Sequence, residues 1–282
     1  MERRLLISLT FIVASFGLLG YAIWHTNVFH TIREFQPTES SKNVPTLQFI
    51  AVGDNHGDNP IYEQILSEVK TGPYAFLLNA ADETNDGTAE EFAVVKQLHS
   101  QLPFPVEYTV GSHDFRADPT RKLFVDAFHQ QPCRSADYQQ LHLIVLDNGD
   151  RKVGFPADCL NWLKTDLAAH PAQPIVIAYH RPFDLPLSTI TGDDETPASR
   201  ITDAAFLDIL RQSKNIKLII TAHLHTFLPY TLDGIPAVVT GGGGDQAQQI
   251  LGGSKANYFH YLVVTVHGDD VSYVVHRVQL TS

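Results

Sequence analysis

Residues 47–56 read Leu47-Gln-Phe-Ile-Ala-Val-Gly-Asp-Asn-His56, and this segment shows the pattern around which the chain is organised. Apolar, β-favouring residues run as far as Gly53, and Asp54 and His56 follow two positions apart. Residues i and i+2 of extended backbone point to the same side, so this carboxylate and imidazole are expected to converge. Both groups are ligands for divalent metals. The segment therefore predicts a strand that leads into a metal-binding pair, with an ordinary turn as the alternative.

Later apolar runs end in the same kinds of residue. Because the carboxyl ends of parallel strands meet at one edge of a sheet, these strand ends together predict a metal site at that edge. The later runs and the polar residues that follow them are Ala75–Ala81 with Asp82, Val106–Ser112 with His113 and Asp114, Ile175–Tyr179 with His180, and Leu218–Ala222 with His223 and His225.

Strands and helices alternate through most of the chain, which predicts βαβ units and a largely parallel sheet. The C-terminal part differs, because its apolar runs have no helix between them and Gly268-Asp-Asp270 fits a hairpin turn. We therefore expect an α/β fold of the α+β type, with two facing mixed β-sheets, helices outside them and all proposed ligands in one domain. One expected helix begins at Asn59-Pro60. Three further helices are expected over about 89–102, 119–128 and 156–169.

The composition excludes one class of partner. The 282-residue chain carries a formal net charge of −11 and has no cluster of Lys and Arg. A nucleic-acid surface needs such a cluster, so we expect no nucleic-acid partner. Bound divalent cations would offset several of the negative charges locally.

The N-terminal region predicts membrane association. Arg3 and Arg4 precede Leu5–Trp24, a run of twenty uncharged residues that at helical rise matches the thickness of a hydrocarbon core, about 30 Å. We expect residues 1–24 to be an uncleaved signal anchor that forms a transmembrane helix, with the arginines in the cytoplasm. A cleaved signal peptide, suggested by Gly20-Tyr-Ala22, is the alternative and would make the protein secreted. Residues 25–45 are expected to be a linker, and the rest of the chain to lie outside the cytoplasm, on the periplasmic or extracellular side.

Two further features leave alternatives open. Cys133 and Cys159 either form a disulfide, as an even pair in an exported protein can, or are unrelated residues in a loop and on a helix. The polar segment from Phe183 to Arg200 is expected to be a lid or specificity loop beside His180, with a tolerated surface insertion as the alternative.

The order of these motifs resembles that of the calcineurin-like metallophosphoesterases. That family has Asp-x-His, Gly-Asp-x-x-Asp, Gly-Asn-His-Asp/Glu, a lone His after a strand, and Gly-His-x-His. The resemblance covers residues 46 to about 245, including Gly241-Gly-Gly-Gly244. It implies a four-layer αββα sandwich with a two-metal site, and it makes residues 46–282 the catalytic domain.

The resemblance also implies a role for each motif residue. Asp54, His56 and His225 would hold the first metal, Asp82 would bridge the two, and His180 and His223 would hold the second. His113 would be the acid or electrostatic group beside the leaving oxygen, with Asp114 orienting it. His and Asp ligands suit Mn, Fe or Zn.

Four positions depart from the family pattern: Ala81, Asn85, Ser112 and Ala222. Only Ser112 stands where the family has a metal ligand, an Asn whose amide oxygen binds the second metal. A neutral hydroxyl is a poorer ligand, so we expect a weaker or more hydrated second site.

These features predict a metal-dependent hydrolase of phosphate esters. Its substrate would be a small-molecule, lipid or nucleotide phosphate, either a monoester or a diester, because the residues that decide between these lie in loops such as 183–200. The alternative is a degenerate, non-catalytic metal- or partner-binding domain, which Ser112 suggests. The presence of His113, which has no metal-ligand role, argues against that alternative.

Overall fold

Strand β1 (Thr46–Val52) contains the apolar part of the segment that opens the sequence argument, and it lies in the middle of a sheet. The computed structural model describes residues 45–185, 196–245 and 258–279, which all belong to one compact unit, Asn43–Ser282. The predicted signal anchor and most of the predicted linker lie outside the described residues. Within those residues, no helix is long and apolar enough to cross a membrane.

The first sheet has five strands in the order β11-β10-β1-β2-β3. β1 runs parallel to β2, and β2 runs parallel to β3, whereas β10 and β11 form an antiparallel hairpin that joins the other side of β1. The hairpin turns at the predicted Gly268-Asp-Asp270. The bounds are β2 Leu77–Asn79, β3 Val106–Tyr108, β10 His260–His267 and β11 Asp270–Arg277.

The second sheet has six strands in the order β4-β5-β6-β7-β9-β8. Its central strands are parallel, and each edge strand, β4 or β8, is antiparallel to its neighbour. The expectation of two mixed sheets is therefore confirmed. The bounds are β4 Arg134–Tyr138, β5 Leu141–Val145, β6 Ile175–Ala178, β7 Ile216–Thr221, β8 Phe227–Leu232 and β9 Ile235–Thr240.

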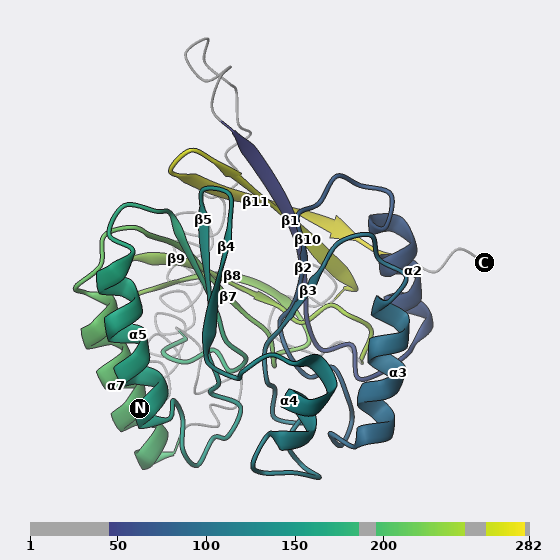
Figure 1. Cartoon of the computed structure of the whole chain (residues 1–282), viewed down its shortest axis with the longest axis horizontal. Coiled ribbons are helices and arrows are strands. Elements are labelled where there is room, and N and C mark those ends of the chain that lie inside the picture. The colour runs from purple at the N-terminus through teal and green to yellow at the C-terminus, as the bar shows by residue number, and fades with distance from the viewer. Residues whose placement is uncertain (1–44, 186–195, 246–257, 280–282) are drawn as a thin grey trace, which may run out of the picture. The chain divides into compact units, whose positions relative to one another are not determined.

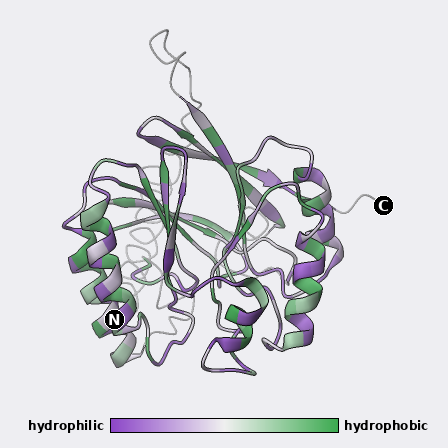
Figure 2. Ribbon diagram, viewed as in Figure 1, coloured by the Kyte–Doolittle hydropathy of each residue, from purple (hydrophilic) through white to green (hydrophobic). Residues whose placement is uncertain are grey.

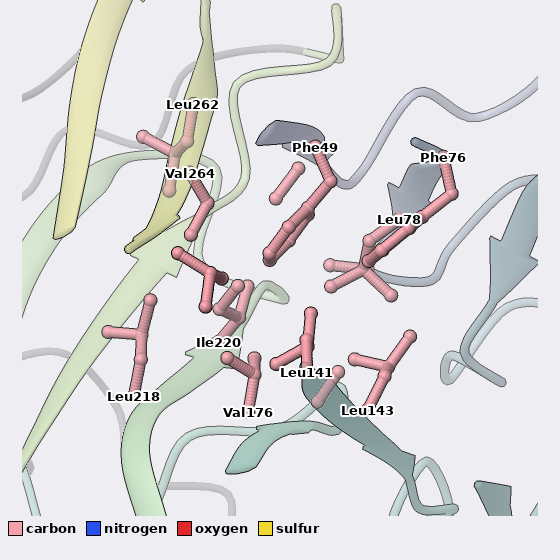
Figure 3. Close-up of a cluster of buried hydrophobic side chains, with 14 of the residues drawn as sticks. Phe49, Phe76, Leu78, Leu141, Leu143, Val176, Leu218, Ile220, Leu262 and Val264 are labelled. Atoms are coloured by element: carbon pink, nitrogen blue, oxygen red, sulfur yellow. The ribbon is translucent and has the colours of Figure 1, made fainter. Parts of the chain in front are cut away.

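The two sheets pack face to face over one apolar core. In β1 the odd-numbered residues Leu47, Phe49 and Ala51 point into this core, whereas Ile50 and Val52 contact the other face, as the period of two in a strand requires. Figure 3 shows Phe49, Phe76 and Leu78 from the first sheet opposite Leu141, Val176 and Ile220 from the second. Burial of this apolar area holds the carboxyl ends of strands from both sheets together.

Helices cover the outer faces of both sheets (Figure 1), which completes the expected αββα arrangement. Helices α2 and α3 lie on one side, and α5 and α7 on the other. In Figure 2 these helices carry both hydrophobic and hydrophilic segments, as expected when one face is buried. The bounds are α2 Pro60–Val69, α3 Ala89–His99, α4 Lys122–Phe128, α5 Ala157–Ala169 and α7 Pro197–Leu210.

Two parts of the sequence interpretation are refined by the structure. Cys133, just before β4, and Cys159, in α5, form a disulfide with a Cα–Cα distance of 5.7 Å. The predicted loop 183–200 ends earlier than expected, because Thr196 caps α7 with its side chain and Pro197 occupies the first turn. Residues 186–195 of that loop lie outside the described part of the chain.

Candidate metal centre

The six predicted metal ligands come together at the carboxyl ends of strands from both sheets. Asp54 and His56 follow β1, Asp82 follows β2, His180 follows β6, and His223 and His225 follow β7. One ligand atom each from Asp54, His56 and His225 lie within 4.8 Å of one another, and the same holds for Asp82, His180 and His223. These two groups are the two sets of ligands that the motif order implies.

The ligands converge through left-handed backbone, not through the extended backbone expected from the sequence. The φ angles are 58° for Asp54, 49° for His56, 50° for Asp82 and 68° for His223. Such a conformation costs an L-residue about 1 kcal/mol or more, and strain of this kind is concentrated at functional sites. Ala81, which replaces a glycine of the family pattern, is also left-handed at φ 87°.

Asp82 lies at the centre of the cluster. Its Oδ2 is 3.2 Å from Nε2 of His180 and 3.9 Å from Nε2 of His56, so it reaches a member of each group. The backbone N–H of His113 donates to Oδ1 at 2.8 Å. Burial raises the pKa of this carboxyl, but the neighbouring His180 ring and the ring and backbone N–H of His113 outweigh burial and hold the pKa well below its usual range. Asp82 is thus an ionised carboxylate in the position of a bridge.

Asp54 gives the strongest evidence that the cluster accommodates cations. The residue is 0% exposed, and within the described part of the chain neither carboxyl oxygen has a hydrogen-bond partner. Burial, and next the charge of Asp82, raise its pKa well above the usual range; the backbone N–H of His223 opposes this without reaching hydrogen-bond geometry. A buried carboxylate without a donor is costly unless a cation compensates it.

Gly241 has no side chain, and this leaves room for the carboxylate of Asp54. A Cβ atom at this position would overlap Oδ2 of Asp54 and the carbonyl oxygen of Leu224. Gly111 has a corresponding relation to Asp82, because a Cβ there would overlap its Oδ1 and its backbone nitrogen. The glycines after β9 and β3 are therefore required by close packing against the two carboxylates.

Two imidazoles of the cluster, those of His56 and His223, favour the neutral form. Burial is the largest cause that lowers the pKa of His56, and it lowers the pKa of His223 well below the usual value. Nε2 of His56 and Nδ1 of His180 are buried without a hydrogen-bond partner among the described residues. A metal ligand must be deprotonated, so these ring nitrogens fit a divalent ion such as Zn²⁺, Mn²⁺ or Fe²⁺.

Ser112 lies beside the ligands, as predicted, but it donates a hydrogen bond. Its Oγ is 3.4 Å from Oδ2 of Asp82. Asp114 differs from expectation more clearly. It accepts hydrogen bonds from the N–H and Oγ1 of Thr84 and from the N–H of Gly111, and in the described part of the chain no hydrogen bond joins it to the His113 ring. Asp114 therefore ties together the loops after β2 and β3.

The His113 ring is held instead by two residues that the sequence did not indicate. Nδ1 lies 2.7 Å from the carbonyl oxygen of Asn85, and Nε2 lies 2.8 Å from NH2 of Arg116. The loop that carries Asn85 is fixed by Glu91 of α3, whose carboxylate accepts from the N–H groups of Asn85, Asp86 and Thr88. A capping box at the start of α3 thus positions the carbonyl that orients His113.

Asp245 is a further member of the site that sequence reasoning missed. Its Oδ2 lies 3.5 Å from Nε2 of His56 and 3.5 Å from Nδ1 of His225. The only signal in the sequence is its place directly after the glycine run 241–244. Asn55, which lies between Asp54 and His56, donates a hydrogen bond to the carbonyl oxygen of Glu83 and accepts one from Asn79. These two hydrogen bonds hold the Asp54–His56 loop in place.

A second group of acidic and imidazole side chains lies at the opposite ends of the strands. His142, near the start of β5, has Nδ1 2.7 Å from Asp137 and Nε2 2.7 Å from Asp166. His170 stacks on it, with ring centroids 3.7 Å apart and planes at 19°. Imidazole lone pairs lie in the ring plane, so stacked rings direct them along separate lines. We therefore interpret this group as an ion-pair cluster around the buried His142 and not as a metal site.

The geometry thus fits a candidate metal site for two ions at the edge where the two sheets meet. A family model described as calcineurin-like phosphoesterase matches residues 47–227, more than half of the chain. The chain belongs to the calcineurin-like phosphoesterase family, whose members use divalent metals in a dinuclear centre. No curated protein matches the chain.

Solved structures show the same fold at low sequence identity. A purple acid phosphatase from yellow lupin (Lupinus luteus) seeds is 13% identical with a TM-score of 0.63, over 83% of this chain and 52% of that chain. This chain therefore spans about half of the lupin protein. GAP50, described as the anchor in the inner membrane complex of Plasmodium, is 13% identical with a TM-score of 0.62, over 84% and 90%. A dimetal phosphatase from Danio rerio is 11% identical with a TM-score of 0.58, over 83% and 99%.

Proposed function

We propose that this chain hydrolyses phosphate esters at a centre of two divalent ions, Mn, Fe or Zn. Asp54, His56 and His225 would hold one ion, His180 and His223 the other, and Asp82 would bridge them. Such ions supply Lewis acidity toward a phosphoryl group and make a water molecule more acidic. The observation that carries the proposal is the buried Asp54 carboxylate, which has no hydrogen-bond donor among the described residues and faces two imidazoles.

The protein's own residues supply orientation and proton transfer. The backbone N–H of His113 and the hydroxyl of Ser112 orient Asp82. The His113 ring lies against the ligand cluster, with its centroid 4.4 Å from that of His56. A proton on Nε2 of His113 could pass to the departing oxygen of the substrate, as general acid catalysis requires. Asn85 keeps that nitrogen directed away from the backbone by binding Nδ1.

The test is hydrolysis of p-nitrophenyl phosphate by the purified full chain with added Mn²⁺. We expect turnover that disappears with a chelator and returns with metal. His113→Ala should lower kcat about 100-fold or more, in the range for loss of a general acid, while metal content stays at the wild-type value. His276→Ala on β11 is the matched control, and should leave kcat unchanged. Metal binding without any turnover would instead support the non-catalytic alternative that Ser112 suggests.

We further propose that the catalytic domain, 46–282, is anchored in a membrane and lies outside the cytoplasm. The support is the uncharged segment Leu5–Trp24 after Arg3 and Arg4, with the linker 25–45 between anchor and domain. The Cys133–Cys159 disulfide is in keeping with an oxidising compartment. Protease added to intact cells should digest the domain. Complete protection of the domain would contradict this topology.

A further inference from the structure

Arg116 contacts the proposed proton donor directly. Its NH2 lies 2.8 Å from Nε2 of His113, and its NH1 lies 3.1 Å from the carbonyl oxygen of Asn85. That same carbonyl is bound by Nδ1 of His113. Arg116, His113 and Asn85 therefore form a closed set of contacts at the edge of the metal centre.

Donor and acceptor chemistry fixes the protons in this set. A guanidinium can only donate, so Nε2 of His113 must accept. A carbonyl can only accept, so Nδ1 carries the ring proton. His113 is thus a neutral imidazole here, and Arg116 covers the nitrogen that would have to face a leaving oxygen.

The contacts of Arg116 are of a kind that a phosphoryl group can replace. Its side chain is 49% exposed, and Asp86, the carboxylate near it at 3.5 Å, is 66% exposed. An exposed ion pair of this sort contributes little. The remaining partners, an imidazole nitrogen and a carbonyl, are uncharged. A phosphoryl oxygen is a stronger acceptor for a guanidinium than either, and it can be bound by two N–H groups at once.

We propose that Arg116 is a specificity-determining residue for phosphate monoesters: its guanidinium turns from Nε2 of His113 to a non-bridging oxygen of the substrate. This inference rests on the proposed function. A monoester has three non-bridging oxygens and up to two negative charges, whereas a diester has two such oxygens and one charge. The additional charged oxygen of the monoester is the group that an arginine at this position recognises.

The same movement couples substrate binding to the proton donor. When Arg116 binds the phosphoryl oxygen, Nε2 of His113 loses its donor and its lone pair is uncovered. Nε2 can then take up a proton from solvent water, and this proton is the one that passes to the leaving oxygen. Asn85 still binds Nδ1, so the ring keeps its orientation. A diester attracts the guanidinium less strongly, and His113 stays covered for more of the time.

The experiment compares two substrates with the same leaving group, p-nitrophenyl phosphate and bis(p-nitrophenyl) phosphate, in the full chain with Mn²⁺. Arg116→Ala should lower kcat/KM for the monoester about 10- to 100-fold, as loss of a charge-assisted hydrogen bond implies. The kcat/KM for the diester should change by less than about 3-fold. Arg116→Lys, which keeps the charge without the planar fork, should recover part of the loss.

A binding measurement separates this inference from the proposed function. Binding of inorganic phosphate and of dimethyl phosphate is measured by calorimetry. Arg116→Ala should weaken the binding of inorganic phosphate and leave that of dimethyl phosphate unchanged. If the wild-type chain hydrolyses neither ester, the proposed function fails, while the binding comparison still decides the role of Arg116.

Two arginines serve as comparisons. Arg211 is the matched control, because it is 53% exposed and pairs with Asp208 and Asp233 away from the metal centre. Arg211→Ala should leave the binding of both phosphate compounds unchanged. Equal effects of Arg116→Ala on both ligands would overturn the inference. The second comparison is Arg181, which directly follows the candidate ligand His180. A change in the monoester preference produced by Arg181→Ala and not by Arg116→Ala would also overturn the inference.

Discussion

Nε2 of His180 lies 3.2 Å from Oδ2 of Asp82, although the two residues follow strands of different sheets. Asp82 follows β2 of the five-stranded sheet, and His180 follows β6 of the six-stranded sheet. Both side chains are almost completely buried, at 2% and 0% exposed. The ligand set is therefore complete only when the two sheets pack face to face, and the apolar core between them is a condition for metal binding.

Ser112 should determine the affinity of the second metal. Its Oγ already lies 3.4 Å from Asp82, so an Asn amide oxygen at this position should reach the ion that His180 and His223 hold. Ser112→Asn is expected to lower the Mn²⁺ concentration for half-maximal activity about 10-fold, the effect of one added ligand-type interaction of about 1.4 kcal/mol. A metal titration followed by activity measures this. Ser112→Ala is the control, and an Asn variant that binds the second metal no more tightly would contradict the weakened-ligand interpretation.

Gly241→Ala should remove metal without unfolding the protein. The new Cβ would overlap Oδ2 of Asp54 and the carbonyl oxygen of Leu224, and the backbone at 241 is not in the left-handed region. The damage should therefore fall on Asp54 and on the loop just before His225. We expect metal content and activity to fall together, with an unchanged circular dichroism spectrum. Gly234→Ala is the comparison, because φ there is 84° and no atom lies within 4 Å of the new Cβ. It should cost about 1 kcal/mol of stability and leave metal content intact. Loss of stability without loss of metal in Gly241→Ala would show that backbone strain, and not contact with Asp54, makes Gly241 necessary.

The convergence of the candidate ligands could be predicted from the sequence because each follows the end of an apolar run. Apolar runs give buried strands, and the carboxyl ends of parallel strands share an edge. The edge strands β4 and β8 were not predicted. β4 is polar and only partly buried, and β8 contains Pro229, which an edge strand tolerates because one side needs no backbone donor.

The supporting residues of the site depend on loop geometry that a strand pattern does not contain. Arg116 contacts the ring of His113, which lies three positions earlier in the chain, only because the loop after β3 turns back on itself. In this turn the N–H of Arg116 donates a hydrogen bond to the carbonyl oxygen of His113. Asp245 reaches His56 and His225 from a loop after β9, across both sheets. The left-handed backbone of Asp54 and His56 is likewise a property of the packed loops and not of the residue types alone.

His142 should make the stability of the domain depend on pH. Burial lowers the pKa of His142, but hydrogen bonds to Asp166 and Asp137 outweigh it and raise the pKa above the usual value. Burial raises the pKa of Asp166, but His142 outweighs it and lowers that pKa. The His142 contribution is complete below its unfolded-state pKa and is lost as pH rises through the folded-state value. The Asp166 contribution is present above its unfolded-state pKa and is lost as pH falls through the folded-state value.

Between these limits, at about pH 5, His142→Gln should cost about 2 kcal/mol, the scale of a hydrogen bond to a charged group. Thermal unfolding of wild type and variant across pH tests this, and the difference in Tm should shrink as the solution becomes alkaline. His276→Gln, an exposed histidine on β11, is the control. A difference in Tm that does not vary with pH would show that the His142 charge makes no contribution.

The Cys133–Cys159 disulfide should stabilise the domain through its closed loop. The sequence separation of 26 residues corresponds, on the loop-entropy estimate, to about 3.5 kcal/mol. Replacing both cysteines by Ser should lower the free energy of unfolding by this order, as measured in urea. Two free thiols in the unfolded, non-reduced protein would show that the bridge does not form.

The metal content of the purified full chain and of Asp82→Asn, measured beside hydrolysis of p-nitrophenyl phosphate, tests the central claim most directly. Among the residues that the structure describes, Asp82 is the one carboxylate that reaches both groups of histidines, so its replacement should affect both ions. We predict about two divalent ions per wild-type chain, as a two-metal site requires, and a variant in which metal content and activity fall together. An Asp82→Asn variant that retains the wild-type metal content and turnover would contradict a dinuclear centre bridged by Asp82.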